Sequence, residues 1–190
     1  KSFLDKYFSF IAIIILFPIF IFIYLFIKII DKTDPIFIQK RIGKNGKLFY
    51  LYKFKTLRDS NYYKDKDSKY TVRNTDSRIT NIGFFLRISS IDEIPQFFNV
   101  LKGDMSLVGP RPSIEGHPYF ASKYPKELRP RLFFKPGLTG LAQISGRNKL
   151  SNKEKYEIDI AYSKNINFWL DLKILFLTPI VLINPKVNFE

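Results

Sequence analysis

The chain lacks cysteine altogether and contains a single histidine, His117. The absence of cysteine excludes a disulfide framework, a thiolate nucleophile and a zinc site with cysteine ligands. One histidine cannot form a histidine cluster around a metal ion, and no residue near His117 in the sequence stands out as a partner that would orient it as a base. By elimination, a catalytic acid, base or nucleophile in this chain is expected to be a carboxylate.

Acidic residues are scarce relative to basic ones, because 31 Lys and Arg against 17 Asp and Glu give a net charge of +14. So large an excess in 190 residues predicts an anionic partner. Nucleic acid, anionic lipid headgroups and diphosphate substrates all meet this requirement. Composition alone therefore does not choose among these partners. The length of the chain allows one domain with a hydrophobic core.

The first long hydrophobic run decides part of this question. Phe8 to Ile27 is apolar apart from Ser9 and Pro18, and about 20 apolar residues suffice for a helix to cross the hydrocarbon layer. A cleaved signal peptide is the alternative, but its apolar region is usually about 7–15 residues long and ends at a small-residue cleavage site. Here the charged stretch Lys28–Lys32 follows instead. We therefore predict a membrane-embedded helix over residues 1–31.

The sequence leaves open whether this helix crosses the membrane. Basic residues flank both of its ends, so the positive-inside rule favours the C-terminal flank inside only weakly. Pro18, at the midpoint, removes a helical hydrogen bond and is expected to kink the helix. The kinked helix is either a spanning helix or a re-entrant helix that returns to the side from which it started.

Residues 32–190 are expected to form one domain of the α+β class, mainly helical. Extended runs on both sides of the turn Gly43-Lys44-Asn45-Gly46 predict a short β-hairpin. Ser151 and Glu154 have the spacing of a capping box, which predicts a helix over Ser151–Ser163.

The last apolar run, Phe168–Ile183, is shorter than a comfortable membrane span and contains Asp171 and Lys173. With Trp169 at its start, it is expected to be an amphipathic helix that lies in the headgroup region. A buried core helix is the alternative. The domain is thus expected to sit at the membrane surface.

Two adjacent carboxylates, Asp92 and Glu93, are the strongest candidates for chemistry. A carboxylate can hold Mg²⁺ or attack phosphorus. The alternative is structural: either Ser90 caps a helix in a capping box with Glu93, or Asp92 is the cap and Pro95 lies in the first turn. An aspartate at a helix N-terminus would also place phosphate where the helix dipole favours anions.

Cations around this pair suit phosphate binding. Arg111 lies between Pro110 and Pro112, so its backbone is pre-ordered, and its guanidinium can pair bidentately with phosphate oxygens. Four further cations are candidates for binding phosphate or nucleotide: Lys53, Lys55, Arg87 and Arg147. The alternatives are a solvated strand edge for the two lysines and plain salt bridges for the arginines.

The segment Arg87–Pro112, RISSIDEIPQFFNVLKGDMSLVGPRP, resembles the core of the monotopic phosphoglycosyl transferases. This bacterial family moves a sugar-1-phosphate from a nucleotide diphosphate sugar to a membrane polyprenol phosphate. Other segments that match the family are Tyr52–Thr56, Phe134–Gly140, Leu141–Gln143 and Gly146–Asn148. The resemblance extends from about Phe8 to about Ile180. One departure concerns the family's re-entrant helix, which is usually broken at a Ser-Pro pair, whereas this chain has Phe17-Pro18.

The resemblance implies specific roles. Asp92 would be the nucleophile that forms a covalent phosphosugar intermediate, with Glu93 assisting and Mg²⁺ held near both. The implied substrates are a UDP-sugar and a polyprenol (undecaprenyl) phosphate, and UMP is released. It further implies a bacterial inner-membrane protein whose catalytic domain lies on the cytoplasmic face and begins the assembly of a glycoconjugate such as O-antigen, capsule or glycoprotein.

Two other functional classes remain as alternatives. A membrane-tethered nucleic-acid-binding module would explain the net charge, but the aromatic residues concentrate in the apolar segments and no recognised binding motif occurs, so no nucleic acid is expected. A non-catalytic membrane scaffold would tolerate loss of the Asp92–Glu93 pair. The sequence leaves the sugar, the pathway and a homo-oligomeric state open.

Overall fold

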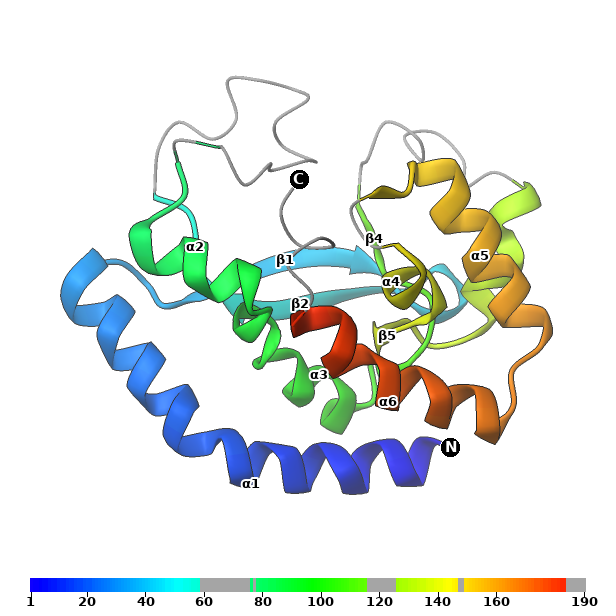
Figure 1. The fold of residues 1–190 in the computed structure, drawn as a ribbon, viewed down its shortest axis with the longest axis horizontal. Coiled ribbons are helices and arrows are strands. Elements are labelled where there is room, and N and C mark those ends of the chain that lie inside the picture. Colours follow the sequence, from blue (N-terminus) through cyan, green and yellow to red (C-terminus); the bar gives the residue numbers. More distant parts are fainter. Residues whose placement is uncertain (59–75, 77, 116–125, 147–148, 184–190) are drawn as a thin grey trace.

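The computed structural model describes residues 1–58, 76, 78–115, 126–146 and 149–183. A long helix, α1 (Ser2–Phe26), continues into a π-helical turn, Ile27–Asp31, and ends where Lys32 adopts a left-handed conformation with φ of 51°. Pro18 lies inside α1, which is visibly bent along its length (Figure 1). Within the described residues this is the one helix long and apolar enough to cross a membrane.

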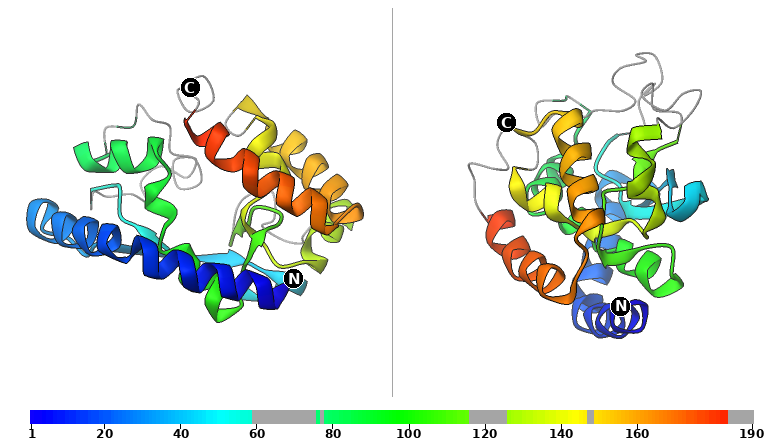
Figure 2. Two further views of the ribbon diagram at one scale, coloured as in Figure 1. Left: turned by 60° about the horizontal axis from the view of Figure 1, so that its bottom comes forward. Right: turned by 90° about the vertical axis from the view of Figure 1, so that its right-hand side faces the viewer.

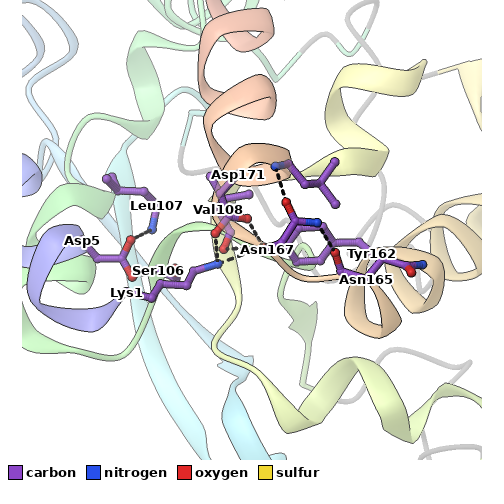
Figure 3. A network of polar contacts seen from close by, with 10 residues as sticks. Lys1, Asp5, Ser106, Leu107, Val108, Tyr162, Asn165, Asn167 and Asp171 are labelled. Carbon is purple, nitrogen blue, oxygen red and sulfur yellow. Dashed lines mark hydrogen bonds and ion pairs between the residues drawn. The ribbon is translucent and has the colours of Figure 1, made fainter.

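The start of α1 is fastened to the domain by buried polar contacts (Figure 3). Asp5, which is buried, accepts a hydrogen bond of 2.8 Å from the hydroxyl of Ser106. Lys1 forms an ion pair of 2.7 Å with Asp171 and donates a hydrogen bond of 2.9 Å to the hydroxyl of Tyr162. Because an unpaired buried carboxylate is costly, the contact of Asp5 orients one face of this apolar helix toward the domain.

The other end of α1 packs against the same domain through apolar contacts. Ile23 and Ile27 are buried in a cluster with Phe54 and Leu86. At about 1.5 Å per residue, the 25 residues of α1 measure about 37 Å, and both ends of this length lie against one domain. Helix α1 therefore runs along the domain (Figure 2).

A three-stranded antiparallel sheet crosses the domain, in the order β2-β1-β4. Its strands are β1 (Ile36–Ile42), β2 (Leu48–Phe54) and β4 (Ser113–Ile114). The turn between β1 and β2 contains Asn45 with φ of 56°, as short hairpin connections require. The predicted hairpin is confirmed, and the fold is the expected mainly helical α+β class.

A second, parallel pair joins β3 (Ser106–Val108) to β5 (Gly137–Thr139). The backbones come very close just beyond it, because a Cβ atom on Gly137 would lie 2.1 Å from the amide nitrogen of Gly109. Only glycine fits there. This approach holds the chain that follows β3 next to β5.

The helices of the domain surround these strands (Figure 1). They are α2 (Asn81–Ile88), α3 (Gln96–Lys102), α4 (Leu141–Ser145), α5 (Asn152–Lys164) and α6 (Phe168–Ile183), with 3₁₀ segments at Ile91–Glu93 and Lys126–Phe133. The predicted capping box is present at the start of α5, where Ser151 and Glu154 exchange hydrogen bonds. The main core lies between β2, β3, α3, α5 and α6.

Helix α6 differs from the amphipathic helix predicted for these residues. Its buried face packs into the core through Ile174, and its opposite face exposes Trp169, Phe176 and Ile180. Apolar side chains therefore occupy both faces of α6. One face packs into the core, and the other is exposed. The N-terminal end of α6 lies beside the start of α1 (Figure 2), so two exposed apolar surfaces adjoin.

Candidate active site

Asp92 lies in the 3₁₀ turn Ile91–Glu93, which Ser90 precedes in a left-handed conformation with φ of 56°. Neither Ser90 nor Asp92 caps a helix through its side chain, because α3 starts only after Pro95 and has no side-chain cap. Both helix-capping predictions were wrong. The reason is tertiary: the carboxylate of Asp92 faces β2, where its Oδ2 atom lies 3.9 Å from Nζ of Lys53.

The Asp92 side chain is only 8% exposed, and this burial raises its pKa to about 6. The positive charges of Lys53, Arg87 and Arg111 lower that pKa in part, while the neighbouring Glu93 raises it further. Burial also lowers the pKa of Lys53, and the charge of Asp92 partly offsets this effect. At neutral pH the site therefore holds an ionised carboxylate that few water molecules solvate, which favours nucleophilic attack.

Glu93 pairs with a different cation, on the turn that follows β3. Its Oε1 atom accepts a hydrogen bond of 2.8 Å from Nη2 of Arg111, whose side chain is 50% exposed. The predicted association of Arg111 with the carboxylate pair is therefore present in the structure. A half-exposed guanidinium beside a partly buried carboxylate can reach an incoming phosphate.

Two arginines that the sequence analysis missed hold the backbone of this turn. Arg41 donates a hydrogen bond of 2.9 Å to the carbonyl of Pro112, and Arg131 donates one of 2.7 Å to the carbonyl of Arg111. Arg131 is itself buried and forms an ion pair with Asp159. The turn is thus fixed by side chains behind it, which leaves the guanidinium of Arg111 for the site.

Pro110 takes part in the same support, because its carbonyl accepts a hydrogen bond of 2.9 Å from the amide of Gly137. Arg131 also lies over the ring of Tyr156 at 4.6 Å from the centroid, and Asp159 keeps a raised pKa of about 6 because it is buried. These partners are far apart in the sequence, so no local sequence pattern predicts their contacts.

The other predicted cations divide into three cases. Arg87, in the last turn of α2, lies close enough for its charge to act on Asp92 and Lys53. Lys55 follows β2 and is not among the charges that act most strongly on Asp92. Arg147 lies outside the described residues, as does His117.

Magnesium ions in proteins are bound by oxygen atoms, mainly those of carboxylates and phosphates. Within the part of the chain that the structure describes, no three Asp, Glu or His side chains gather into a cluster that could enclose a metal ion. Two adjacent carboxylates, Asp92 and Glu93, suit Mg²⁺ nonetheless, because this ion is usually held by one or two carboxylates together with substrate phosphates. The residues fit a metal that arrives with a diphosphate.

Comparisons with known proteins show which family the chain resembles. The family model described as bacterial sugar transferase matches residues 1–185. The chain is 47% identical over 147 residues to an uncharacterized sugar transferase, EpsL, of Bacillus subtilis, covering 76% of this chain and 68% of that protein.

Two longer relatives have names that state an activity. The galactosyl transferase CpsE of Streptococcus agalactiae is 44% identical over 158 residues, which cover 78% of this chain and 34% of the relative. A UDP-glucose:undecaprenyl-phosphate glucose-1-phosphate transferase of Xanthomonas campestris is 35% identical over 194 residues, which cover all of this chain and 40% of the relative. The chain thus spans well under half the length of these two proteins.

Proposed function

The chain belongs to the bacterial sugar transferase family, and we propose that it transfers a sugar-1-phosphate from a UDP-sugar to a membrane polyprenol phosphate. The observation that carries the proposal is the pairing of two adjacent carboxylates with two cations, Asp92 with Lys53 and Glu93 with Arg111. An assay of UMP release across a panel of UDP-sugars, with polyprenol phosphate present, tests it. No UMP release with any UDP-sugar would refute it.

In the first step, the Oδ2 oxygen of Asp92 attacks the sugar-bearing phosphorus. The bond from that phosphorus to the bridging oxygen breaks, and the electron pair leaves with UMP. Lys53 lies beside Asp92 and Arg111 beside Glu93, and both cations would neutralise the phosphate oxygens of the substrate. When bound, Mg²⁺ supplies charge neutralisation for the diphosphate and the leaving group.

In the second step, a phosphate oxygen of the polyprenol phosphate attacks the same phosphorus. The bond to Asp92 breaks, and the carboxylate is restored. Arg111 remains in place for both steps because its backbone is fixed from behind. The exposed apolar faces of α1 and α6 keep the site at the membrane surface, where the lipid substrate is concentrated.

Activity should depend on pH through Asp92. Since its pKa is raised to about 6, the nucleophile is protonated below that pH, and kcat/KM should fall about tenfold per pH unit. Lys53→Met should move this acidic limb to higher pH, because the charge of Lys53 lowers the pKa of Asp92. The measurement is kcat/KM for the UDP-sugar from about pH 5 to 8. A flat profile over this range would contradict the assigned nucleophile.

We propose further that α1 enters the membrane from the cytoplasmic side and returns to it, so that the protein resides on that face of the bacterial inner membrane. The support is that Asp5, near one end of the helix, and Ile27, just past the other, both contact the same domain. A helix that crossed the membrane would separate these contacts by the bilayer. Helix α1 contains Pro18 and is bent (Figure 1), and this bend lets its apolar middle reach the lipid while both ends stay at the surface.

This topology has a direct test, because the chain contains no cysteine and single-cysteine variants need no background removal. Ser2→Cys, at the start of α1, and Glu157→Cys, on exposed α5, should react with an impermeant thiol reagent only after the cells are opened. Ile14→Cys, in the middle of α1, should stay unreactive in lipid. Reaction of Ser2→Cys in intact cells would establish a crossing helix instead.

A membrane-tethered nucleic-acid-binding module is the other candidate that the net charge favours. It predicts tight binding to nucleic acid that weakens steeply with salt, with no UMP release. Nucleic-acid binding and UMP release can be measured on the same purified protein.

A further inference from the structure

An apolar pocket of about 320 Å³ lies directly beside the carboxylate pair. Its walls come from α3, α4, α6 and the segment around β5, and most of its lining is hydrocarbon, including Ile94, Phe97, Leu138, Ile144, Leu175 and Leu182. The hydroxyls of Thr139 and Thr178, which also line it, are 2.7 Å apart and bond to each other. The interior therefore offers few hydrogen bonds to a ligand.

Among the described residues that line this pocket, the charged ones are Glu93 and Arg111. Both residues belong to the candidate active site described above, and Glu93 is the sequence neighbour of Asp92, so this end of the pocket adjoins the site. A ligand with an anionic group at the half-exposed guanidinium of Arg111 and hydrocarbon beyond it would match both parts. A sugar or a nucleoside would lose hydrogen bonds to water in such a pocket without regaining them.

The rim on α6 connects the pocket to the outer apolar surface. Leu175 lines the pocket and is 37% exposed, and its neighbour Phe176 is 69% exposed on the outward face. A hydrocarbon chain can therefore pass from the pocket onto the exposed face of α6 without crossing polar surface. This continuity favours a lipid that is partly held by the protein and partly by the bilayer.

Resting on the proposed function, we propose that this pocket binds the isoprene units next to the phosphate of the polyprenol phosphate, and that Arg111 binds the phosphate itself. The pocket is at the small end of ligand sites, so only the first part of a long polyprenyl chain fits. The remainder leaves past Leu175 into the membrane. The pocket would thus place the second substrate's phosphate beside the phosphorus that Asp92 holds.

The test compares KM values for the two substrates in purified enzyme in bilayer nanodiscs, using undecaprenyl phosphate and a UDP-sugar that the wild type accepts. Leu175→Ser should raise KM for the lipid about tenfold, because an apolar contact is lost, and should leave KM for the UDP-sugar unchanged. Phe22→Ser is the control, because it removes an exposed apolar side chain of α1 that does not line the pocket, and it should leave both KM values near those of the wild type. Equal lipid KM values for wild type and Leu175→Ser would overturn the proposal.

A substitution of Gln143 distinguishes whether the pocket binds a lipid or a nucleotide. Its amide lines the pocket, and neither amide atom has a hydrogen-bond partner among the described residues. Gln143→Leu, which makes the wall more apolar at similar volume, should lower KM for the lipid severalfold. If it raised KM for the UDP-sugar instead, the pocket would hold the nucleotide, and the proposal would be wrong.

A labelling experiment covers the case in which a variant folds poorly. Leu182→Cys introduces a lone thiol into the pocket wall, and undecaprenyl phosphate should slow its alkylation at least about fivefold, whereas the UDP-sugar should not. Unchanged alkylation in the presence of the lipid would contradict the proposed binding site. If wild-type enzyme released no UMP at all, the proposed function would fail first, independently of the pocket.

Discussion

Replacing Asp92 by asparagine should lower the rate of UMP release by at least about 10³-fold, because an amide cannot attack phosphorus as a carboxylate does. The fold should survive. Burial raises the pKa of Asp92, which means that the ionised side chain is held against a desolvation cost that a neutral amide avoids. The thermal midpoint at pH 7 should therefore not fall, and activity and stability are measured on the same purified variant.

Asp34→Asn is the matched control, because it makes the same substitution at an exposed position outside the site. It should keep wild-type activity. Glu93→Gln should also be severely impaired, since its carboxylate orients Arg111. If Asp92→Asn turned over at more than a tenth of the wild-type rate, Asp92 would not be the nucleophile.

The second large effect concerns the order of the reaction. Enzyme mixed with an equal amount of labelled UDP-sugar and Mg²⁺, without lipid, should release UMP and retain the sugar-phosphate on the protein. Peptide mapping should place the label on Asp92. Steady-state kinetics should follow a ping-pong pattern, which is the signature of a covalent intermediate.

Removing Mg²⁺ with a chelator should abolish both the UMP release and the labelling, because the charge of the diphosphate would be uncompensated during attack. Readdition of Mg²⁺ should restore them, and Ca²⁺ at the same concentration is the control for ion identity. Transfer that requires both substrates at once, with no labelled protein, would show direct transfer. Asp92 would then serve as a metal ligand or base.

Elements with local signals were predictable from the sequence. The β-hairpin around Asn45 and the helix that Ser151 caps both follow from turn and capping residues only a few positions apart. The parallel strands β3 and β5 were not predicted, because each has three residues and a run that short shows no periodicity.

The residues of the site were likewise predictable where the signal is local and were missed where it is not. The Asp92–Glu93 pair and Arg111 were found because they are close in sequence and chemically distinctive. The capping role of Asp92 was wrong because a residue on another element, Lys53, decides where its carboxylate points. Asp159 was missed since its partner Arg131 is distant in sequence, and neither residue stands in a recognisable motif.

The docking of both ends of α1 on one domain also bears on how the protein reaches the membrane. Lysines stand at each end of the helix, Lys1 and Lys6 at its start and Lys28 and Lys32 beyond Phe26. For a threaded helix, one of these basic flanks would have to be translocated against the usual charge preference. The proposed topology needs no translocation: the folded domain would adsorb, the apolar middle would sink into one leaflet, and the ammonium groups of Lys6, Lys28 and Lys32 would stay among the anionic headgroups, while Lys1 pairs with Asp171 of the domain. In this topology, basic residues at both ends of the helix would attach the protein to the same membrane surface.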